Sequence, residues 1–90
     1  MPDLPRFEIV HEHEFDEQLS RLIVDPELAD EFIAGAEEML ARDPRGGISV
    51  TEDDSIWYLP MSPVRRRRVS LFYAFDEETV NLLWIVAYDD

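Results

Sequence analysis

The sequence predicts an α+β fold in which a strand and two helices precede a set of antiparallel strands. Two stretches between residues 15 and 43 carry apolar side chains at helical spacing. The apolar stretches after residue 47 are short and rich in β-branched and aromatic residues, which is typical of strands. Because the helices come before the strands instead of alternating with them, we expect both helices on one face of a small sheet. A length of 90 residues predicts a single domain over residues 1–90.

The N-terminal part of the chain begins with a short strand and a helix. Residues 7–11 read Phe-Glu-Ile-Val-His, an alternation typical of a strand. The next apolar side chains recur at the spacing of one helix face, which predicts a helix over residues 15–24. Its apolar stripe consists of Phe15, Leu19, Leu22 and Ile23.

A second helix begins at a capping pair. Asp25 suits the N-cap position, and Pro26 suits the first helical position because the N–H it lacks would have no partner there. An apolar stripe that starts at Leu28 predicts a helix over residues 26–43, which Pro44 and the glycines after it end.

Four strands are predicted after the second helix. They cover residues 48–51, 56–59, 69–75 and 79–88. We expect the first to be an edge strand and the second to stop at Pro60, because proline lacks the N–H that a central strand needs. The last is the most apolar and is therefore expected to be central.

Alternation along the last two strands divides their side chains between the two faces of the sheet. The helix-facing row of residues 69–75 is predicted to be Val69, Leu71, Tyr73 and Phe75. The opposite row, on the face without helices, is predicted to be Arg66, Arg68, Ser70, Phe72 and Ala74. Trp84 has the parity of Leu82, Val86 and Tyr88 and is expected on that open face, although packing of Trp84 in the core is an equal alternative.

The charge is strongly acidic and unevenly distributed. The chain has 21 acidic residues against eight basic ones, all arginine, for a net charge of −13. Half of the arginines form one run, Arg65 to Arg68. A body this acidic repels nucleic acid at long range, so RNA would have to bind locally at the arginine run. A simpler explanation of the acidity is solubility.

The composition excludes several classes of protein. The absence of cysteine rules out disulfides and thiolate metal sites and fits a cytoplasmic location. Residues 1–6 lack the features of a signal peptide, and no apolar run approaches the roughly 18 residues that cross a bilayer. His11 and His13 would face one side of the first strand beside acidic residues, but spacing places no third ligand, so we expect no metal.

Three local motifs, in order, resemble those of the RelE/ParE toxin superfamily, the toxin halves of bacterial toxin–antitoxin pairs. Residues 40–47, Leu-Ala-Arg-Asp-Pro-Arg-Gly-Gly, are similar to the family's helix exit. Residues 56–59, Ile-Trp-Tyr-Leu, are similar to its tryptophan-containing strand. Residues 68–83 are similar to its hairpin, R-x-x-Y-x-x-D followed by V-x-L-L. The resemblance covers nearly the whole chain and implies the same order of strands and helices.

The resemblance implies a toxin that cleaves messenger RNA on the ribosome without a metal or other cofactor and that pairs with a cognate antitoxin. Arginine suits this chemistry because a guanidinium can bind two oxygens of a doubly charged phosphorane. The candidate catalytic residues are Arg66 and Arg68, for phosphate, and Tyr88, which resembles a C-terminal tyrosine that contributes to catalysis. The candidate partner-binding residues are Arg65, Arg67, Phe72 and Trp84. Neither a membrane nor a small-molecule substrate is expected.

Departures from the family pattern keep alternatives open. Ser70 stands where the family usually has arginine, three residues before the hairpin tyrosine, two acids follow Tyr88, and the chain has no lysine. The arginine run can also guard a sheet edge or balance the chain's own acids, and Tyr88 can simply pack against the sheet. The alternative functions are a toxin that binds a protein target such as DNA gyrase, and an inactive member that only binds its antitoxin.

Overall fold

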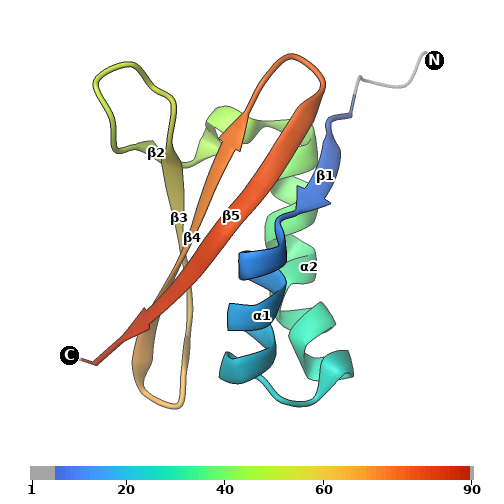
Figure 1. Cartoon of the computed structure of the whole chain (residues 1–90), viewed down its shortest axis with the longest axis vertical. Coiled ribbons are helices and arrows are strands. Elements are labelled where there is room, and N and C mark those ends of the chain that lie inside the picture. The colour runs from blue at the N-terminus through green and yellow to red at the C-terminus, as the bar shows by residue number, and fades with distance from the viewer. Residues whose placement is uncertain (1–5, 90) are drawn as a thin grey trace.

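The computed structural model describes residues 6–89, and the order of its elements is the predicted one. They are β1 (Glu8–His11), α1 (His13–Leu22), α2 (Pro26–Arg42), the 3-10 helix η1 (Pro44–Gly46), β2 (Ile48–Ser49), β3 (Trp57–Val64), β4 (Arg67–Phe75) and β5 (Thr79–Tyr88). One five-stranded sheet runs in the order β1-β5-β4-β3-β2 (Figure 1). β1 is parallel to β5, and the other neighbouring pairs are antiparallel. The predicted α+β class is therefore confirmed.

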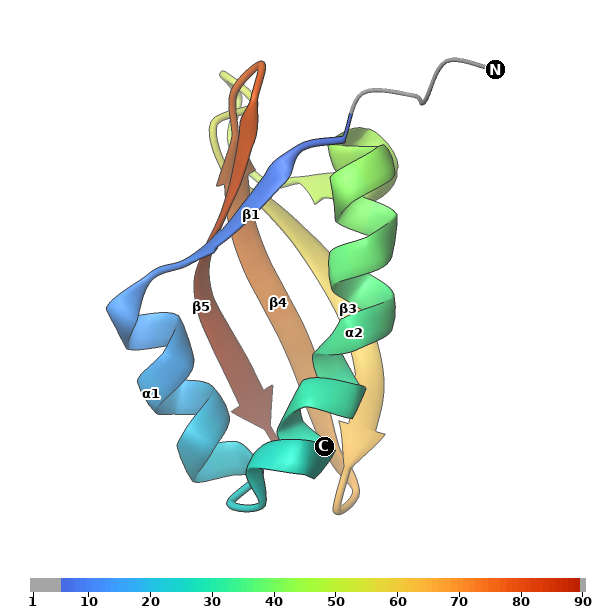
Figure 2. The same ribbon diagram turned by 90° about the vertical axis from the view of Figure 1, so that its right-hand side faces the viewer.

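Both helices pack on the same face of the sheet, and the described residues place no helix on the other face (Figure 2). We call the uncovered side the open face. The core lies between the layers and consists of Phe15, Leu19, Ala29, Ile33, Ala36, Leu40, Val69, Leu71, Tyr73, Val80, Leu82 and Ile85. The helix-facing row predicted for β4 is confirmed, since its first three members are buried and Phe75 packs against the core. Burial of each larger apolar side chain contributes about 1.5–3 kcal/mol, which holds the helices on the sheet.

Helix α2 starts as predicted. The Asp25 carboxylate accepts the Glu27 N–H at 2.9 Å, and Pro26 follows as the first helical residue. Its buried stripe starts one position later than predicted, because Ala29 faces the core whereas Leu28 is 55% exposed. A small side chain at that contact lets the helix approach the sheet closely. Helix α1 begins and ends two residues earlier than predicted.

Strand β3 passes through Pro60 and Pro63, so the predicted stop at Pro60 is wrong. β2 pairs only with Trp57 and Tyr58, which leaves the rest of β3 at the edge of the sheet. An edge strand tolerates proline when the missing N–H would have faced outward, and proline there also prevents another strand from adding.

Tyr73 ties the exit of α2 to the sheet. Its buried hydroxyl donates to the Pro44 carbonyl at 2.6 Å and accepts the Gly47 N–H at 3.1 Å. Burial raises the pKa of this phenol. A Cβ on Gly47 would overlap the Tyr73 hydroxyl and lie 2.7 Å from the Tyr58 carbonyl oxygen, so only glycine fits this close approach.

Residues 6–89 contain no helix with the length and apolarity needed to span a membrane. Residues 1–5, on which most of the signal-peptide expectation depends, lie outside the described residues.

Candidate functional site

Arg68 and Tyr88 lie side by side on the open face. They are directly opposite each other in the β4–β5 register, and such pairs in an antiparallel sheet point to the same side. Ser70 shares this face, with its hydroxyl 3.4 Å from the Tyr88 hydroxyl. Ser70 is buried, whereas Arg68 is exposed and Tyr88 is 44% exposed. The sheet thus brings a guanidinium, a phenol and a hydroxyl together where a partner can reach them.

Arg68, Ser70 and Tyr88 line a shallow pocket together with residues of β3. The pocket has a volume of about 320 Å³, and its other walls are formed by Tyr58, Pro60, Met61, Pro63 and Val69. The β3–β4 register shifts between Met61 and Val64. Such irregularities bend a strand and are frequent beside functional sites.

Arg66 does not belong to the open-face row, so its predicted placement there is wrong. Arg65 and Arg66 form the two-residue turn between the paired residues Val64 and Arg67, with φ angles of 51° and 69°. Positive φ at both positions is typical of the type I′ turn that matches the twist of a hairpin. The β3–β4 pairing imposes this conformation, although arginine rarely adopts it. A role for Arg66 in phosphate binding stays a prediction.

The other arginines of the run lie on the helix side. Arg67 donates to the Ala87 carbonyl at 3.0 Å, and its Nε lies 3.4 Å from the Asp89 carboxylate. Arg65 lines a hollow between the β3–β4 turn and the loop that joins the helices. The run is therefore divided between two sides of the sheet, as alternation predicted, and Arg68 is the member that reaches Tyr88.

Sequence reasoning expected Phe72 and Trp84 on the open face, but it missed that they belong to a row of apolar side chains that crosses four strands. Ile48, Tyr58, Phe72 and Trp84 are successive partners in the registers of β2, β3, β4 and β5. The Tyr58 and Phe72 ring centroids are 5.9 Å apart, and Phe72 stacks on Trp84 at 5.6 Å with 25° between the ring planes. We call Tyr58, Phe72 and Trp84 the aromatic row.

A β-bulge brings Trp84 into this row. Phe72 pairs with Trp84 and Tyr73 pairs with Leu82, which leaves Leu83 without a partner. The extra residue shifts the alternation by one, so Leu82 is fully buried in the core while Trp84 lies on the open face. The prediction that Leu82 shares the face of Trp84 is therefore wrong. A single-strand pattern carries no signal for a bulge, because the bulge is defined by the neighbouring strand.

The two ends of the sheet differ in charge. Strands β2 to β5 contain no Asp or Glu, and the arginine turn lies at one end of them. At the other end the two turns carry Glu52, Asp53, Asp54, Asp76, Glu77 and Glu78. Hydrogen bonds from Ser55 and Thr51 lower the pKa of Asp53, and the backbone N–H groups of Glu78 and Thr79 lower the pKa of Asp76. These carboxylates stay ionised, so RNA phosphate would be repelled from this end.

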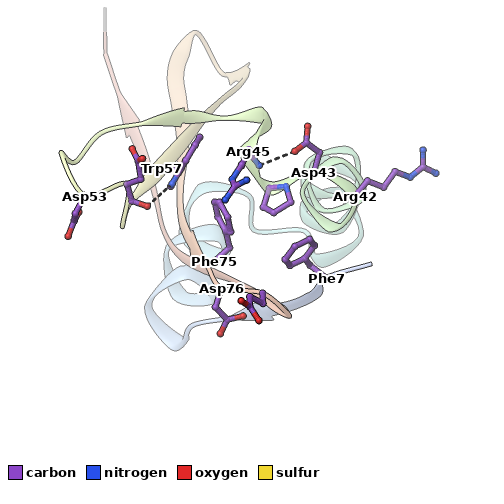
Figure 3. Close-up of a pocket in the computed structure, with 11 residues that line it drawn as sticks. Phe7, Arg42, Asp43, Arg45, Asp53, Trp57, Phe75 and Asp76 are labelled. Carbon is purple, nitrogen blue, oxygen red and sulfur yellow. Dashed lines mark hydrogen bonds between the residues drawn. The ribbon is translucent and has the colours of Figure 1, made fainter. Parts of the chain in front are cut away.

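A larger pocket, of about 920 Å³, lies at the acidic end and contains none of the predicted site residues (Figure 3). Its aromatic wall includes Trp57 and Phe75, whose ring centroids are 5.5 Å apart. The Arg45 guanidinium lies 6.0 Å from the Phe75 ring centroid, and Arg45 also lines the pocket. This pocket is therefore separate from the Arg68–Tyr88 site.

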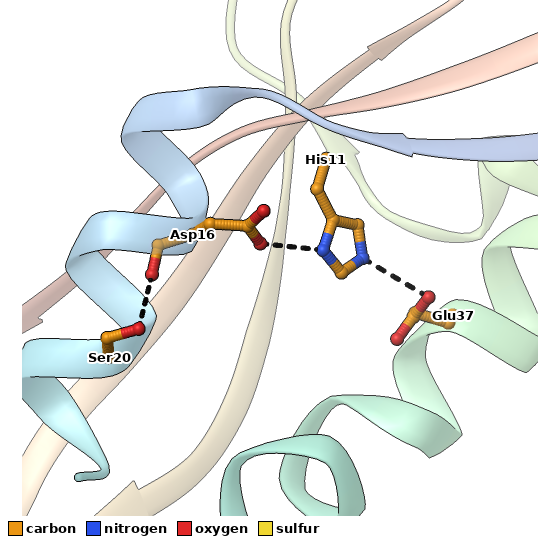
Figure 4. A network of polar contacts seen from close by, with 4 residues as sticks. All are labelled: His11, Asp16, Ser20 and Glu37. Atoms are coloured by element: carbon orange, nitrogen blue, oxygen red, sulfur yellow. Dashed lines mark hydrogen bonds and ion pairs between the residues drawn. The ribbon is translucent and has the colours of Figure 1, made fainter. Parts of the chain in front are cut away.

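The two histidines do not share one side of β1, which corrects the sequence expectation. His11 is held between Asp16 of α1 at 2.7 Å and Glu37 of α2 at 3.3 Å (Figure 4). His13 already belongs to α1 and pairs with Glu17 at 3.0 Å. Among residues 6–89 no group of three or more His, Asp or Glu side chains is arranged to hold a metal ion. His11 therefore joins β1 to both helices as a structural contact.

Comparisons with known proteins identify the fold. No protein-family model matches the sequence, and no curated protein shows significant similarity to it. A chain of the toxin–antitoxin complex RelBE2 from Mycobacterium tuberculosis matches with a TM-score of 0.68 and 19% identity over 100% of both chains. The 90-residue protein therefore has a RelE-like fold. The conserved hypothetical protein HP0894 from Helicobacter pylori matches with a TM-score of 0.53 and 14% identity, over 90% of this chain and 93% of that one.

The RelE-like fold explains why the sequence motifs occur in this order. The three motifs follow one another along the chain and lie in neighbouring elements. They are the end of α2 at Pro44, the strand β3 that starts at Trp57, and the β4–β5 hairpin. Identity below 20% establishes the fold alone and does not assign a role to Arg68 or Tyr88.

Proposed function

We propose that this protein is the toxin of a type II toxin–antitoxin pair, located in the cytoplasm, and that it cleaves messenger RNA on the ribosome. The RelE-like fold supports the first part. The observation that carries the second part is the placement of Arg68 directly opposite Tyr88 on the open face. Fold does not specify activity, so the nuclease proposal depends on this pair.

The proposed reaction is a transesterification within RNA. The ribose 2′-oxygen forms a bond to the adjacent phosphorus and the bond to the 5′-oxygen breaks, which leaves a 2′,3′-cyclic phosphate and a 5′-hydroxyl. The 2′-hydroxyl loses one proton and the leaving 5′-oxygen gains one, so no co-reactant is consumed. Arg68 would bind two oxygens of the doubly charged phosphorane, and Tyr88 would assist proton transfer. The Ser70 hydroxyl, 3.4 Å away, would position the phenol.

The charge distribution supports a local phosphate site despite the net charge of −13. None of the residues of β2 to β5 is acidic. Exposed charges more than a Debye length away, about 8–10 Å at ordinary ionic strength, are largely screened. Phosphate at Arg68 would therefore experience mainly the guanidinium and the nearby charges of Arg67 and Asp89, which pair with each other at 3.4 Å.

Two variants that remove the same charge test the nuclease proposal. Arg68→Gln should lower transcript cleavage by purified protein on translating ribosomes by about 100-fold or more, as loss of a transition-state donor does. Arg67→Gln should retain cleavage, because Arg67 lies on the helix side. Thermal melts of both variants check that they fold. Full cleavage by folded Arg68→Gln would contradict the proposed role.

The proposal includes a cognate antitoxin as partner, since RelBE2 is a toxin–antitoxin complex. Expression of this chain alone should stop bacterial growth, and co-expression of a small neighbouring gene that encodes a DNA-binding protein should restore it. Normal growth on expression of the chain alone would contradict the toxin assignment.

A second candidate function is a toxin that binds a protein target, such as DNA gyrase, without cutting RNA. The aromatic row favours it, because half-exposed rings on an uncovered face are typical of protein-binding surfaces. Growth arrest that persists in Arg68→Gln, with intact transcripts on translating ribosomes, would favour this candidate over the nuclease.

A further inference from the structure

The aromatic row is built by the sheet and not by chance exposure of single rings. Tyr58, Phe72 and Trp84 come from three neighbouring strands and occupy directly opposed positions, so the pairing of the backbone aligns their rings. All three side chains are partly exposed, and none belongs to the core cluster or packs against it. The rings of Phe72 and Trp84 are close to parallel, at 25°.

The bulge at Leu83 has the specific effect of turning Trp84 outward. Leu82 and Ile85 both face the core, and regular alternation after Leu82 would have buried position 84 instead. A tryptophan in the core would have contributed more to stability than one on the surface. The bulge thus leaves a large ring partly exposed and gives the aromatic row its third member.

The same face leads from the rings to the candidate catalytic pair. Along β4 the side chains on this face are Phe72, Ser70 and Arg68 in succession, and along β5 they are Trp84, Val86 and Tyr88. Each ring lies four positions along its strand from the candidate catalytic residue, which corresponds to about 13 Å at the rise of a β-strand. A short single strand of nucleic acid can span this distance.

We propose that the aromatic row is a stacking platform for bases of single-stranded RNA whose scissile phosphate lies at Arg68. This inference rests on the proposed nuclease function and adds the site that holds the substrate strand. Proteins that bind single strands without sequence preference combine aromatic rings with nearby cations, because every base has a π-face. The open face offers both, and its strands have no acidic residue.

The platform also explains how so acidic a chain would retain RNA. Base stacking does not depend on counterion release, whereas phosphate contacts do. With one phosphate contact at Arg68, the slope of log affinity against log salt should be only about −0.7. Binding would therefore tolerate salt, unlike that of a basic RNA-binding protein.

The test measures binding of a fluorescently labelled ten-nucleotide oligoadenylate to the whole chain. Trp84→Leu and Phe72→Leu keep apolar side chains but remove the ring faces, and each should weaken binding by about tenfold. The matched control is Trp57→Phe, which changes the tryptophan that packs against the core and should bind as the wild type does. In that variant Trp84 is the remaining tryptophan, and its fluorescence should be quenched when the oligonucleotide binds.

Several results would overturn the platform. One is wild-type affinity in folded Trp84→Leu and Phe72→Leu, and another is absence of oligonucleotide binding by the wild type. A change in Trp84 fluorescence with a basic amphipathic peptide but not with RNA would make the open face a protein-docking surface instead. Thermal melts confirm that each variant is folded.

The outcome separates the platform from the proposed function. Loss of cleavage in Arg68→Gln together with unchanged binding in Trp84→Leu would support the nuclease proposal and contradict the stacking platform. Weakened binding in Trp84→Leu together with full cleavage in Arg68→Gln would support the platform and remove Arg68 from the reaction.

Discussion

On the helix-covered face of the sheet, Val69, Leu71 and Tyr73 are buried to 3% exposure or less beneath α1 and α2. On the open face, Arg68 of the same strand is exposed, and Phe72 is partly exposed and contacts the rings of Tyr58 and Trp84. Alternate residues of β4 therefore build the core, and of the residues between them Arg68 and Phe72 are accessible, whereas Ser70 is buried. We therefore expect a substitution in β4 to affect stability when the side chain faces the helices and to affect binding when it lies on the open face.

The two tyrosines of the hairpin show the same contrast. Tyr73 is fully buried, and its hydroxyl bonds both Pro44 and Gly47. Tyr88 is 44% exposed, and its hydroxyl has only the 3.4 Å contact with Ser70 among the described hydrogen bonds. The first phenol stabilises the fold, and the second is the phenol for which we propose a role in catalysis.

The largest expected effect on stability compares two consecutive residues of β4. Leu71→Ala should lower the free energy of unfolding by about 2–5 kcal/mol, because it opens a cavity in the core. Phe72→Ala should cost only about 1 kcal/mol, chiefly its ring contacts. Urea denaturation of both variants measures the difference. Equal losses would abolish the contrast between the two faces.

The next effect compares the tyrosines. Tyr73→Phe should lower the free energy of unfolding by about 1–3 kcal/mol, because it leaves the Pro44 carbonyl and the Gly47 N–H without their partner. Tyr88→Phe should change stability by less than about 0.5 kcal/mol and should lower RNA cleavage. If Tyr88→Phe were destabilised but fully active, both phenols would have a structural role and Tyr88 would have none in cleavage.

Substitution of two glycines compares a position where a Cβ would clash with one where it would meet no other atom. Gly47→Ala should lower the free energy of unfolding by about 1–3 kcal/mol, because its Cβ would overlap Tyr73. Gly35→Ala, on the exposed side of α2 with no atom within 4 Å of the new Cβ, should raise it by about 0.5–1 kcal/mol. Thermal melts that move in the same direction for both variants would contradict this assignment.

The smallest effect concerns the acidic turn between β4 and β5. The N–H groups of Glu78 and Thr79 hold the pKa of Asp76 below its ordinary value of 3.8. The folded-state pKa is therefore lower than the unfolded one, so the stabilisation is present above about pH 4 and is lost as the pH falls through the folded-state pKa. Asp76→Asn should slightly lower the melting temperature at pH 7 and leave it unchanged at pH 2. A deficit that persists at pH 2 would show that charge is not the cause.

Several parts of the fold follow from local chemistry and were predictable. The Asp25 cap, the proline after it and the end of α2 near Pro44 depend on neighbouring residues only. The parity of β4 was predictable because residues 68–71 alternate between polar and apolar, and the period of two then continues to Phe75. Arg68 and Tyr88 were named from the sequence, together with Arg66, as candidate catalytic residues, and the β4–β5 register makes Arg68 and Tyr88 direct neighbours.

Other features depend on the partner strand and could not be read from local patterns. Pro60 remains in β3 because β2 is too short to pair with it there. Arg66 adopts a positive φ because β3 and β4 close on a two-residue turn. The row from Tyr58 to Trp84 exists because two separate registers coincide at Phe72.

The sequence by itself determined the order of helices and strands and the face that each residue of β4 occupies, because spacing and caps act within a few residues. Only the tertiary structure decided that Leu82 and Trp84 lie on opposite faces and that one arginine of four reaches Tyr88. The physical reason is that register and bulges arise from pairing between distant segments, and a shift of one residue reverses every side chain that follows.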